Sequence, residues 1–184
     1  MRSMELSADH RPPTSDAADL LNRYVRDHWA LAGAGAALAR RAQRSNRNTP
    51  WGHQLERVAR DIEDDDDTLD AIRHALGADG GRIRRLAVVG AERLGRLKLN
   101  GRLLSYSPLS RVYEAEGMAA GITAKRHLWL ALAEAVGPTC AGADLNTLVE
   151  RADDQLATVA SFHRWAVVQA FQPAGPEPAS STRR

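Results

Sequence analysis

The chain has 184 residues, of which 43% are hydrophobic and 26% charged, but only 5% are aromatic. This length suits one domain rather than two, and a core poor in aromatic rings must be built from Leu, Ala and Val, which favours helices over a sheet. The 25 basic and 23 acidic side chains nearly cancel, so the net charge of +2 gives no bias toward nucleic acid or a membrane surface.

Both ends of the chain are rich in Pro, Ser or Gly and carry little apolar surface. We expect residues 1–15 and 172–184 to be disordered and to flank one helical domain over 16–171. The single Cys140 excludes an internal disulfide and a site with several cysteine ligands. No signal peptide is evident, and no apolar run reaches the roughly 20 residues that cross a bilayer. The sequence therefore predicts a cytoplasmic protein without a membrane span.

Four long segments carry apolar residues at helical spacing, and the first two lie in the N-terminal half. The first is predicted over 16–44, with Ser15 or Asp16 as its N-cap. Its apolar stripe holds Leu21, Tyr24, His28, Leu31, Gly35 and Leu38. The second is predicted to start at Thr49, with Pro50 in its first turn, and to stop at Gly77.

The other two helices are predicted in the C-terminal half. The third is capped by Ser107, opens with Pro108 and ends at Gly137. The stripe expected on it holds Leu109, Val112, Glu116, Ala119, Ile122, Arg126 and Leu130. The fourth is capped by Asp144 and ends before Pro173. The stripe expected on it holds Leu145, Leu148, Ala152, Leu156, Val159, His163 and Val167.

The segment between the second and third helices is too long for the loop of roughly 2–8 residues that joins antiparallel neighbours. Apolar residues recur at helical spacing over 81–100, so we expect a short amphipathic helix there that carries the chain from one end of the bundle to the other. The predicted fold class is therefore all-α, a ferritin-like four-helix bundle with a helical crossover between its second and third helices.

Five consecutive acids, Glu63–Asp67, lie inside the second helix. Successive helix residues turn by about 100°, so five of them cover the whole circumference and at least one must face the core. The apolar stripe of this helix places Asp65 or Asp66 there. Because an unpaired buried carboxylate is very costly, we predict that one of these two pairs with a cation on another helix. The candidate partners are Arg126, His163 and, less favoured, His28.

Polar residues interrupt the apolar stripes of all four helices, and two interpretations of them stay open. In the first, they form a buried ionic network that fixes the register of the helices, as buried polar residues do in some coiled coils. In the second, inward carboxylates and imidazoles bind two iron or manganese ions. The candidate metal ligands are His28, Glu63, Asp65, Asp66, Glu116 and His163.

The spacing of these acids departs from that of known di-iron bundles, which use a Glu on each of two helices and Glu-x-x-His on each of the other two. Glu63 with Asp66, and Glu150 with Asp153, have the spacing but carry Asp where His belongs. The motif is degenerate. We therefore predict no catalytic residue and no cofactor, with iron or manganese as the alternative.

The stretch ERLGRLKLNGRLLSYSPLSRVYEAEGMAAGITAKRHLW, Glu92–Trp129, resembles a segment of uncharacterised ferritin-like proteins of high-GC bacteria. The span from about 16 to 171 also fits their length and helix order. The resemblance implies a fold and no activity. No functional residue is carried over from it, because the Glu-x-x-His motif is absent at both expected places.

Basic residues gather on the predicted crossover: Arg82, Arg84, Arg85, Arg93, Arg96, Lys98 and Arg102. No aromatic or base-reading motif accompanies them, so we expect a solvated face that neutralises the acidic run, and no nucleic-acid binding. The sequence favours a non-enzymatic or degenerate ferritin-like protein with a structural or partner-binding role. The expected partner is another protein or a second copy of the chain. The alternative is a di-iron or manganese carboxylate protein that stores metal or acts as an oxidase.

Overall fold

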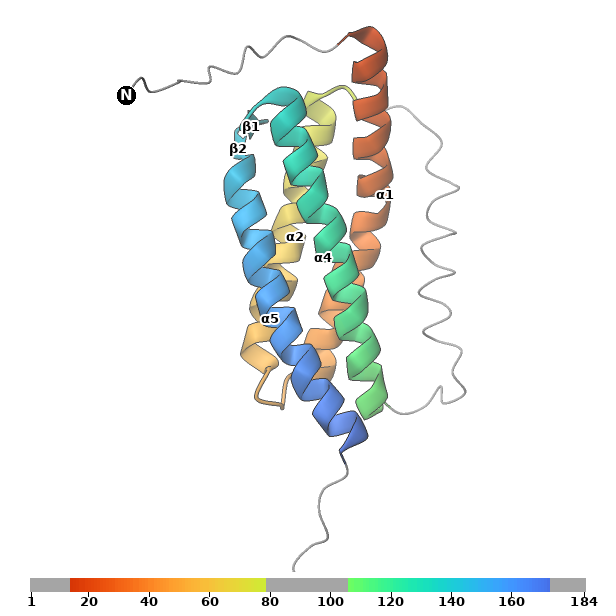
Figure 1. Ribbon diagram of the computed structural model, residues 1–184, viewed down its shortest axis with the longest axis vertical. Helices are drawn as coiled ribbons and strands as arrows, with labels where there is room; N and C mark the ends of the chain where they lie inside the picture. Colours follow the sequence, from red (N-terminus) through yellow and green to blue (C-terminus); the bar gives the residue numbers. More distant parts are fainter. Residues whose placement is uncertain (1–13, 79–105, 173–184) are drawn as a thin grey trace, which may run out of the picture.

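The computed structural model describes residues 14–78 and 106–172. These two ranges hold the helices α1 (Ser15–Asn46), α2 (Gly52–Ala75), α4 (Pro108–Val136) and α5 (Leu145–Phe171), and a short hairpin of β1 (Thr139–Cys140) and β2 (Ala143–Asp144). The helices stand side by side along one axis, with the hairpin at the end where α4 meets α5 (Figure 1). The predicted all-α class is confirmed, since the hairpin adds only four residues of strand.

The helices α1 and α5 run in one direction along the bundle, and α2 and α4 run in the other (Figure 1). Contacts join α1 to α2, α4 to α5, α1 to α4 and α2 to α5. Because α2 ends at one end of the bundle and α4 begins at the other, the chain between them joins opposite ends, as the predicted crossover requires. Within the two described ranges, no helix combines the length and apolar character that crossing a membrane requires.

Some predictions fall on parts of the chain that the structure does not describe. The predicted helix over 81–100 and the basic residues of 82–102 lie outside the described residues. Most of the predicted disordered ends, 1–13 and 173–184, also lie outside them.

The ends of α1 and α2 differ from the predicted ones. Thr14, rather than Ser15 or Asp16, caps α1, and its hydroxyl accepts a hydrogen bond from the backbone N–H of Ala17 at 3.4 Å. The start of α2 moves from Thr49 to Gly52 because the intervening residues form a tight turn. A Cβ on Gly52 would lie 2.5 Å from the carbonyl oxygen of Arg47, so only glycine permits this approach.

The start signals of α4 and α5 act as predicted. Ser107 caps α4, Pro108 follows in the first turn, and Gly137 at φ 95° ends the helix. The Asp144 carboxylate caps α5 by accepting hydrogen bonds from the N–H groups of Asn146 and Thr147 at 2.9 and 3.2 Å. These local signals fix where each helix begins.

The positions that face the interior of the bundle alternate in steps of three and four residues on every helix, as in coiled coils. On α5 they are Leu145, Leu148, Ala152, Gln155, Val159, Phe162 and Ala166, all buried. On α2 they are Leu55, Val58, Ile62, Asp65, Leu69 and Ile72, also buried. On α4 they are Ala115, Met118, Ile122, Lys125, Trp129 and Leu132, and on α1 they are Val25, His28, Ala32, Gly35, Ala39, Ala42 and Asn46.

This repeat corrects the predicted stripes. The predicted stripe of α4 drifts by a residue and includes Glu116 and Leu130, which are exposed. The predicted stripe of α5 is right as far as Ala152 and then takes Leu156 and His163 in place of Gln155 and Phe162. A phase error of one residue turns the inward face by about 100°, which is enough to exchange core and surface.

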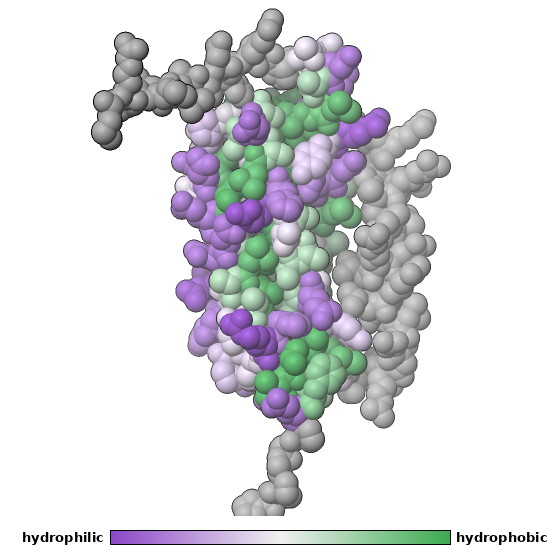
Figure 2. Space-filling model, in the orientation of Figure 1, coloured by the Kyte–Doolittle hydropathy of each residue, from purple (hydrophilic) through white to green (hydrophobic). Residues whose placement is uncertain are grey.

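The apolar core falls into two clusters. One surrounds Leu55, Met118 and Phe162, and the other surrounds Ile72, Trp129 and Leu145. On α2 and α4, the polar side chains of Asp65 and Lys125 lie in sequence between members of the two clusters. On the face drawn in Figure 2, polar side chains gather along the outer edge of α5, while apolar ones appear between α5 and α4.

Candidate functional site

A polar layer lies in the middle of the bundle, around the carboxylate of Asp65. Asp65 is 1% exposed and forms ion pairs with Lys125 of α4 and Arg151 of α5. Gln155 of α5 donates from Nε2 to Oδ2 of Asp65 at 3.2 Å, and its Oε1 accepts from Nζ of Lys125 at 2.8 Å. The prediction of a buried, cation-paired acid in the run is therefore confirmed for Asp65.

The predicted cation partners of this acid are wrong. Arg126 binds Asp153 of α5 near the surface, with its Nε 2.6 Å from Oδ1. His163 lies 3.4 Å from Glu116 in another exposed pair. The reason is the repeat on α4, which turns Lys125 inward and leaves its neighbour Arg126 on the boundary with α5.

The six predicted metal ligands are spread over separate places. Glu63 binds Arg40 of α1 through both carboxylate oxygens. Glu116 and His163 form the exposed pair between α4 and α5, while the other three, His28, Asp65 and Asp66, line one groove. Among the residues that the structure describes, no three His, Cys, Asp or Glu side chains form a group that could hold a metal ion.

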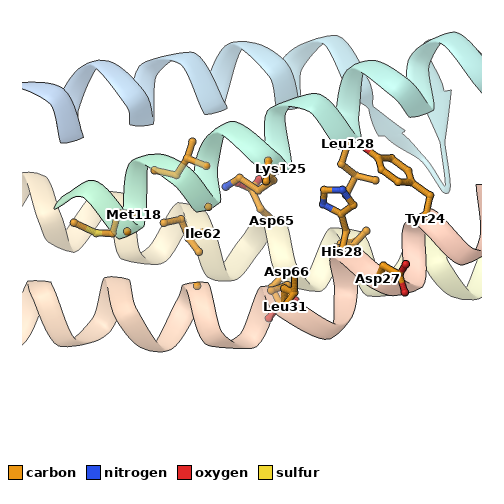
Figure 3. A pocket seen from close by; sticks show the side chains of 17 residues that line it. Tyr24, Asp27, His28, Leu31, Ile62, Asp65, Asp66, Met118, Lys125 and Leu128 are labelled. Carbon is orange, nitrogen blue, oxygen red and sulfur yellow. The ribbon is translucent and has the colours of Figure 1, made fainter. Parts of the chain in front are cut away.

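The groove has a volume of about 410 Å³ and lies between α1 and α4, with α2 as its floor. In Figure 3 the imidazole of His28 points from α1 into this space toward Leu128 of α4, and Asp65 and Lys125 meet at its inner side. Apolar side chains form most of its walls: Leu31 from α1, Ile62 and Leu69 from α2, and Met118, Ile122 and Leu128 from α4.

The groove is open because small residues stand where larger side chains would fill the interior. On α1 the inward positions Ala32 and Gly35 have almost no side chain, and α4 faces them with Gly117 and Gly121. A Cβ added at Gly35 or Gly121 would meet no atom within 4 Å, whereas one at Gly117 would lie 2.8 Å from Cδ2 of Leu38. The helices thus touch near Gly117 and leave space beside Gly35 and Gly121.

Three titratable groups in the groove are shifted by burial. Burial lowers the pKa of the Lys125 ammonium, Arg151 lowers it further, and its partner Asp65 opposes them. Burial raises the pKa of the Asp66 carboxyl, the neighbouring charges of Asp67 and Asp70 raise it further, and Lys125 opposes them. Burial lowers the pKa of His28 despite the nearby charge of Asp27, so its imidazole is neutral at pH 7. Among the described residues, Asp66 has no ion pair, in contrast to Asp65.

A second polar network lies at the C-terminal end of α1, around the buried side chains of Asn46 and Glu114. Tyr106 donates to Glu114 at 2.6 Å and accepts from the side-chain amide of Asn46 at 2.7 Å. Arg111 donates from Nε to Oδ1 of Asn46 at 2.9 Å, and Arg41 Nε lies 2.9 Å from Oε1 of Glu114. Burial raises the pKa of Glu114, while the Tyr106 hydrogen bond and the two arginines lower it by less.

Comparisons with protein-family models, with curated proteins and with solved structures returned no match to this chain.

Proposed function

We propose that this chain is a non-enzymatic, ligand-binding protein with ferritin-like helix order, and that the α1–α4 groove is its binding site. The observation that carries the proposal is the groove itself, whose volume of about 410 Å³ falls within the roughly 300–1,000 Å³ usual for sites of small organic ligands. Its apolar walls supply binding free energy as water leaves them, at about 25 cal/mol per Å² of apolar surface covered.

The groups deepest in the groove support binding over catalysis. Asp65 is held by two cations, and Lys125 is held by Asp65 and Gln155. A carboxylate with both oxygens in ion pairs is a poor general base, and an ammonium held in this way cannot act as a nucleophile without losing its proton and its partner. These side chains stabilise the bundle and give the groove a fixed inner wall.

The size of the groove favours a small ligand over a whole helix from a partner protein. The groove runs from Tyr24 to Gly35 along α1, which is about 16 Å at 1.5 Å per residue. That length is only about three helical turns, so a partner helix would contact the groove over a short part of its length. The protein partner or second copy predicted from the sequence remains a prediction, which a measurement of oligomeric state would check.

The test uses a matched pair of glycines on α1. Gly35 lines the groove and Gly33 does not, and a Cβ at either position meets no atom within 4 Å. A neutral environment-sensitive dye such as Nile red should bind the wild-type protein at one site. Gly35→Met should weaken that binding at least tenfold, while Gly33→Met should leave it unchanged.

Gly121→Met, which fills the groove from the opposite wall, gives a second variant in case Gly35→Met does not fold. Thermal melting of each variant shows whether the bundle is intact. The proposal fails if the wild-type protein does not bind the dye, or if the Gly33 and Gly35 variants weaken it equally.

A further inference from the structure

We infer that the ligand of the α1–α4 groove is an organic cation, a molecule with one ammonium group on an apolar body, and that the carboxylate of Asp66 selects its charge. The inference rests on the proposed function of the groove. It adds a chemical class of ligand and assigns a role in specificity to one residue of the acidic run.

The arrangement of charges around the groove carries the inference. The lining holds the carboxylates of Asp27, Asp65 and Asp66 and the ammonium of Lys125. Arg151 lies behind Asp65 and offsets one more negative charge. With three carboxylates against two cations, and with His28 neutral at pH 7, the net charge is −1 when Asp66 is ionised.

The two cations beside the groove are already paired with another carboxylate. Lys125 and Arg151 are both engaged by Asp65, on the side of the groove that faces α5. Asp66 is half-buried beside the apolar walls and has no ion-pair partner within 14–78 and 106–172. A desolvated carboxylate without a counterion gains more from a cation than one already paired, so a ligand ammonium would complete the site that Asp66 leaves open.

An anion is the least suitable ligand, because Lys125, the cation that lines the groove, is already bound to Asp65. To bind Lys125 it would have to displace Asp65 from a contact that is also supported by Gln155. Asp65 would then keep the ion pair with Arg151 and the hydrogen bond from Gln155 but lose the ion pair with Lys125, and a buried charge that loses a partner is costly.

Binding of a cation should depend on pH in a way that binding of a neutral molecule does not. Burial, Asp67 and Asp70 hold the pKa of Asp66 above its usual range, so the proton stays on until a higher pH. Affinity for the cation should therefore fall as the pH drops through that raised pKa. The other titratable groups that line the groove are Tyr24, Asp27 and His28 on α1, Asp65 on α2 and Lys125 on α4.

The experiment compares three ligands with the same apolar chain: octylammonium, octanol and octanoate, each displacing Nile red from the wild-type protein below its aggregation concentration. We expect octylammonium to bind about tenfold more tightly than octanol, and octanoate to bind most weakly. Asp66→Asn should bring octylammonium to the level of octanol, leave octanol unchanged and weaken the pH dependence, leaving the smaller part that comes from Asp27 and His28.

Asp64→Asn is the matched control, because Asp64 belongs to the same acidic run but is exposed and does not line the groove. It should leave all three affinities unchanged. Equal binding of octylammonium and octanol to the wild-type protein overturns the inference but leaves the groove a binding site. Tightest binding of octanoate also overturns it and points to Lys125. If no ligand binds and the dye does not bind either, the proposed function itself fails.

Discussion

Lys125 of α4 and Asp65 of α2 form an ion pair in the centre of the bundle, although they are 60 residues apart in the sequence. Arg151 and Gln155 of α5 bind the same carboxylate. One acid thus connects three helices at the level where the two apolar clusters meet. Because Asp65 and Gln155 are buried and the two cations are partly buried beside them, the free energy of each group depends on the presence of the others.

The first prediction compares two neighbours in the acidic run. Asp65→Ala leaves Lys125 and Arg151 without their counterion, so it should lower the free energy of unfolding by about 3–5 kcal/mol. Asp66→Ala removes a partly exposed carboxylate without an ion pair among the described residues, and should change stability by no more than about 0.5 kcal/mol. Urea unfolding followed by circular dichroism measures both. Two equally small losses would contradict the buried pair.

The second prediction compares two neighbours on α4. Lys125→Met keeps the apolar stem but removes the ammonium from Asp65, and should cost about 1–3 kcal/mol, since Arg151 remains. Arg126→Met removes a pair with Asp153 whose side chains are 30% and 50% exposed, and should cost less than about 1 kcal/mol. If urea unfolding shows a larger loss of stability for Arg126→Met than for Lys125→Met, then Arg126, not Lys125, faces the interior.

The third prediction concerns pH. Burial raises the pKa of Glu114 in the folded protein, while an unfolded Glu has a pKa of about 4.3. Between these two values the folded state holds the extra proton, so stability should fall as pH rises through that window. The raised pKa of Asp66 also makes stability fall as the pH rises. The measurement is therefore the free energy of unfolding against pH, compared between wild type and Glu114→Gln. The fall should be less steep in the variant, and an unchanged profile would exclude Glu114 as its source.

The fourth prediction concerns metal content. Protein purified without chelator should carry well under one iron or manganese ion per chain by elemental analysis. The physical reason is that Glu63, Asp65 and Glu116 each lie against a cationic or imidazole side chain that competes with a metal for their oxygens. About two ions per chain would instead favour the di-metal alternative, whose ligand set would then include groups beyond these pairs.

The local features of the sequence were sufficient to predict the four long helices and the burial of one acid. The caps Ser107 and Asp144 act on backbone groups within three residues, so they can be identified without knowing the fold. The burial of Asp65 follows from helix geometry, since consecutive acids must sweep through the core-facing direction. The tight turn before Gly52 depends on one close backbone contact and was not predicted.

The partners and the groove depend on relations between helices, which the sequence alone did not define. Lys125 and Arg126 are adjacent cations, and choosing between them requires the phase of the core repeat on α4. Gln155 was missed because the predicted stripe of α5 lost the phase of the repeat after Ala152. The predicted stripe through Tyr24, His28, Leu31 and Gly35 does form one face of α1, but whether that face is filled depends on Gly117 and Gly121 of another helix.

The open groove has a consequence for the motions of α1. The buried residues of this helix are Val25, Ala39, Ala42 and Asn46, so its middle third, between Val25 and Ala39, contains no fully buried side chain. Segments with few buried apolar contacts open at a lower free energy than the whole domain unfolds. Amide protons in the middle of α1 should therefore exchange with solvent sooner than those in the middle of α5. Local opening of this part of α1 would widen the groove for a larger ligand, while the Asp65 layer keeps the other three helices together.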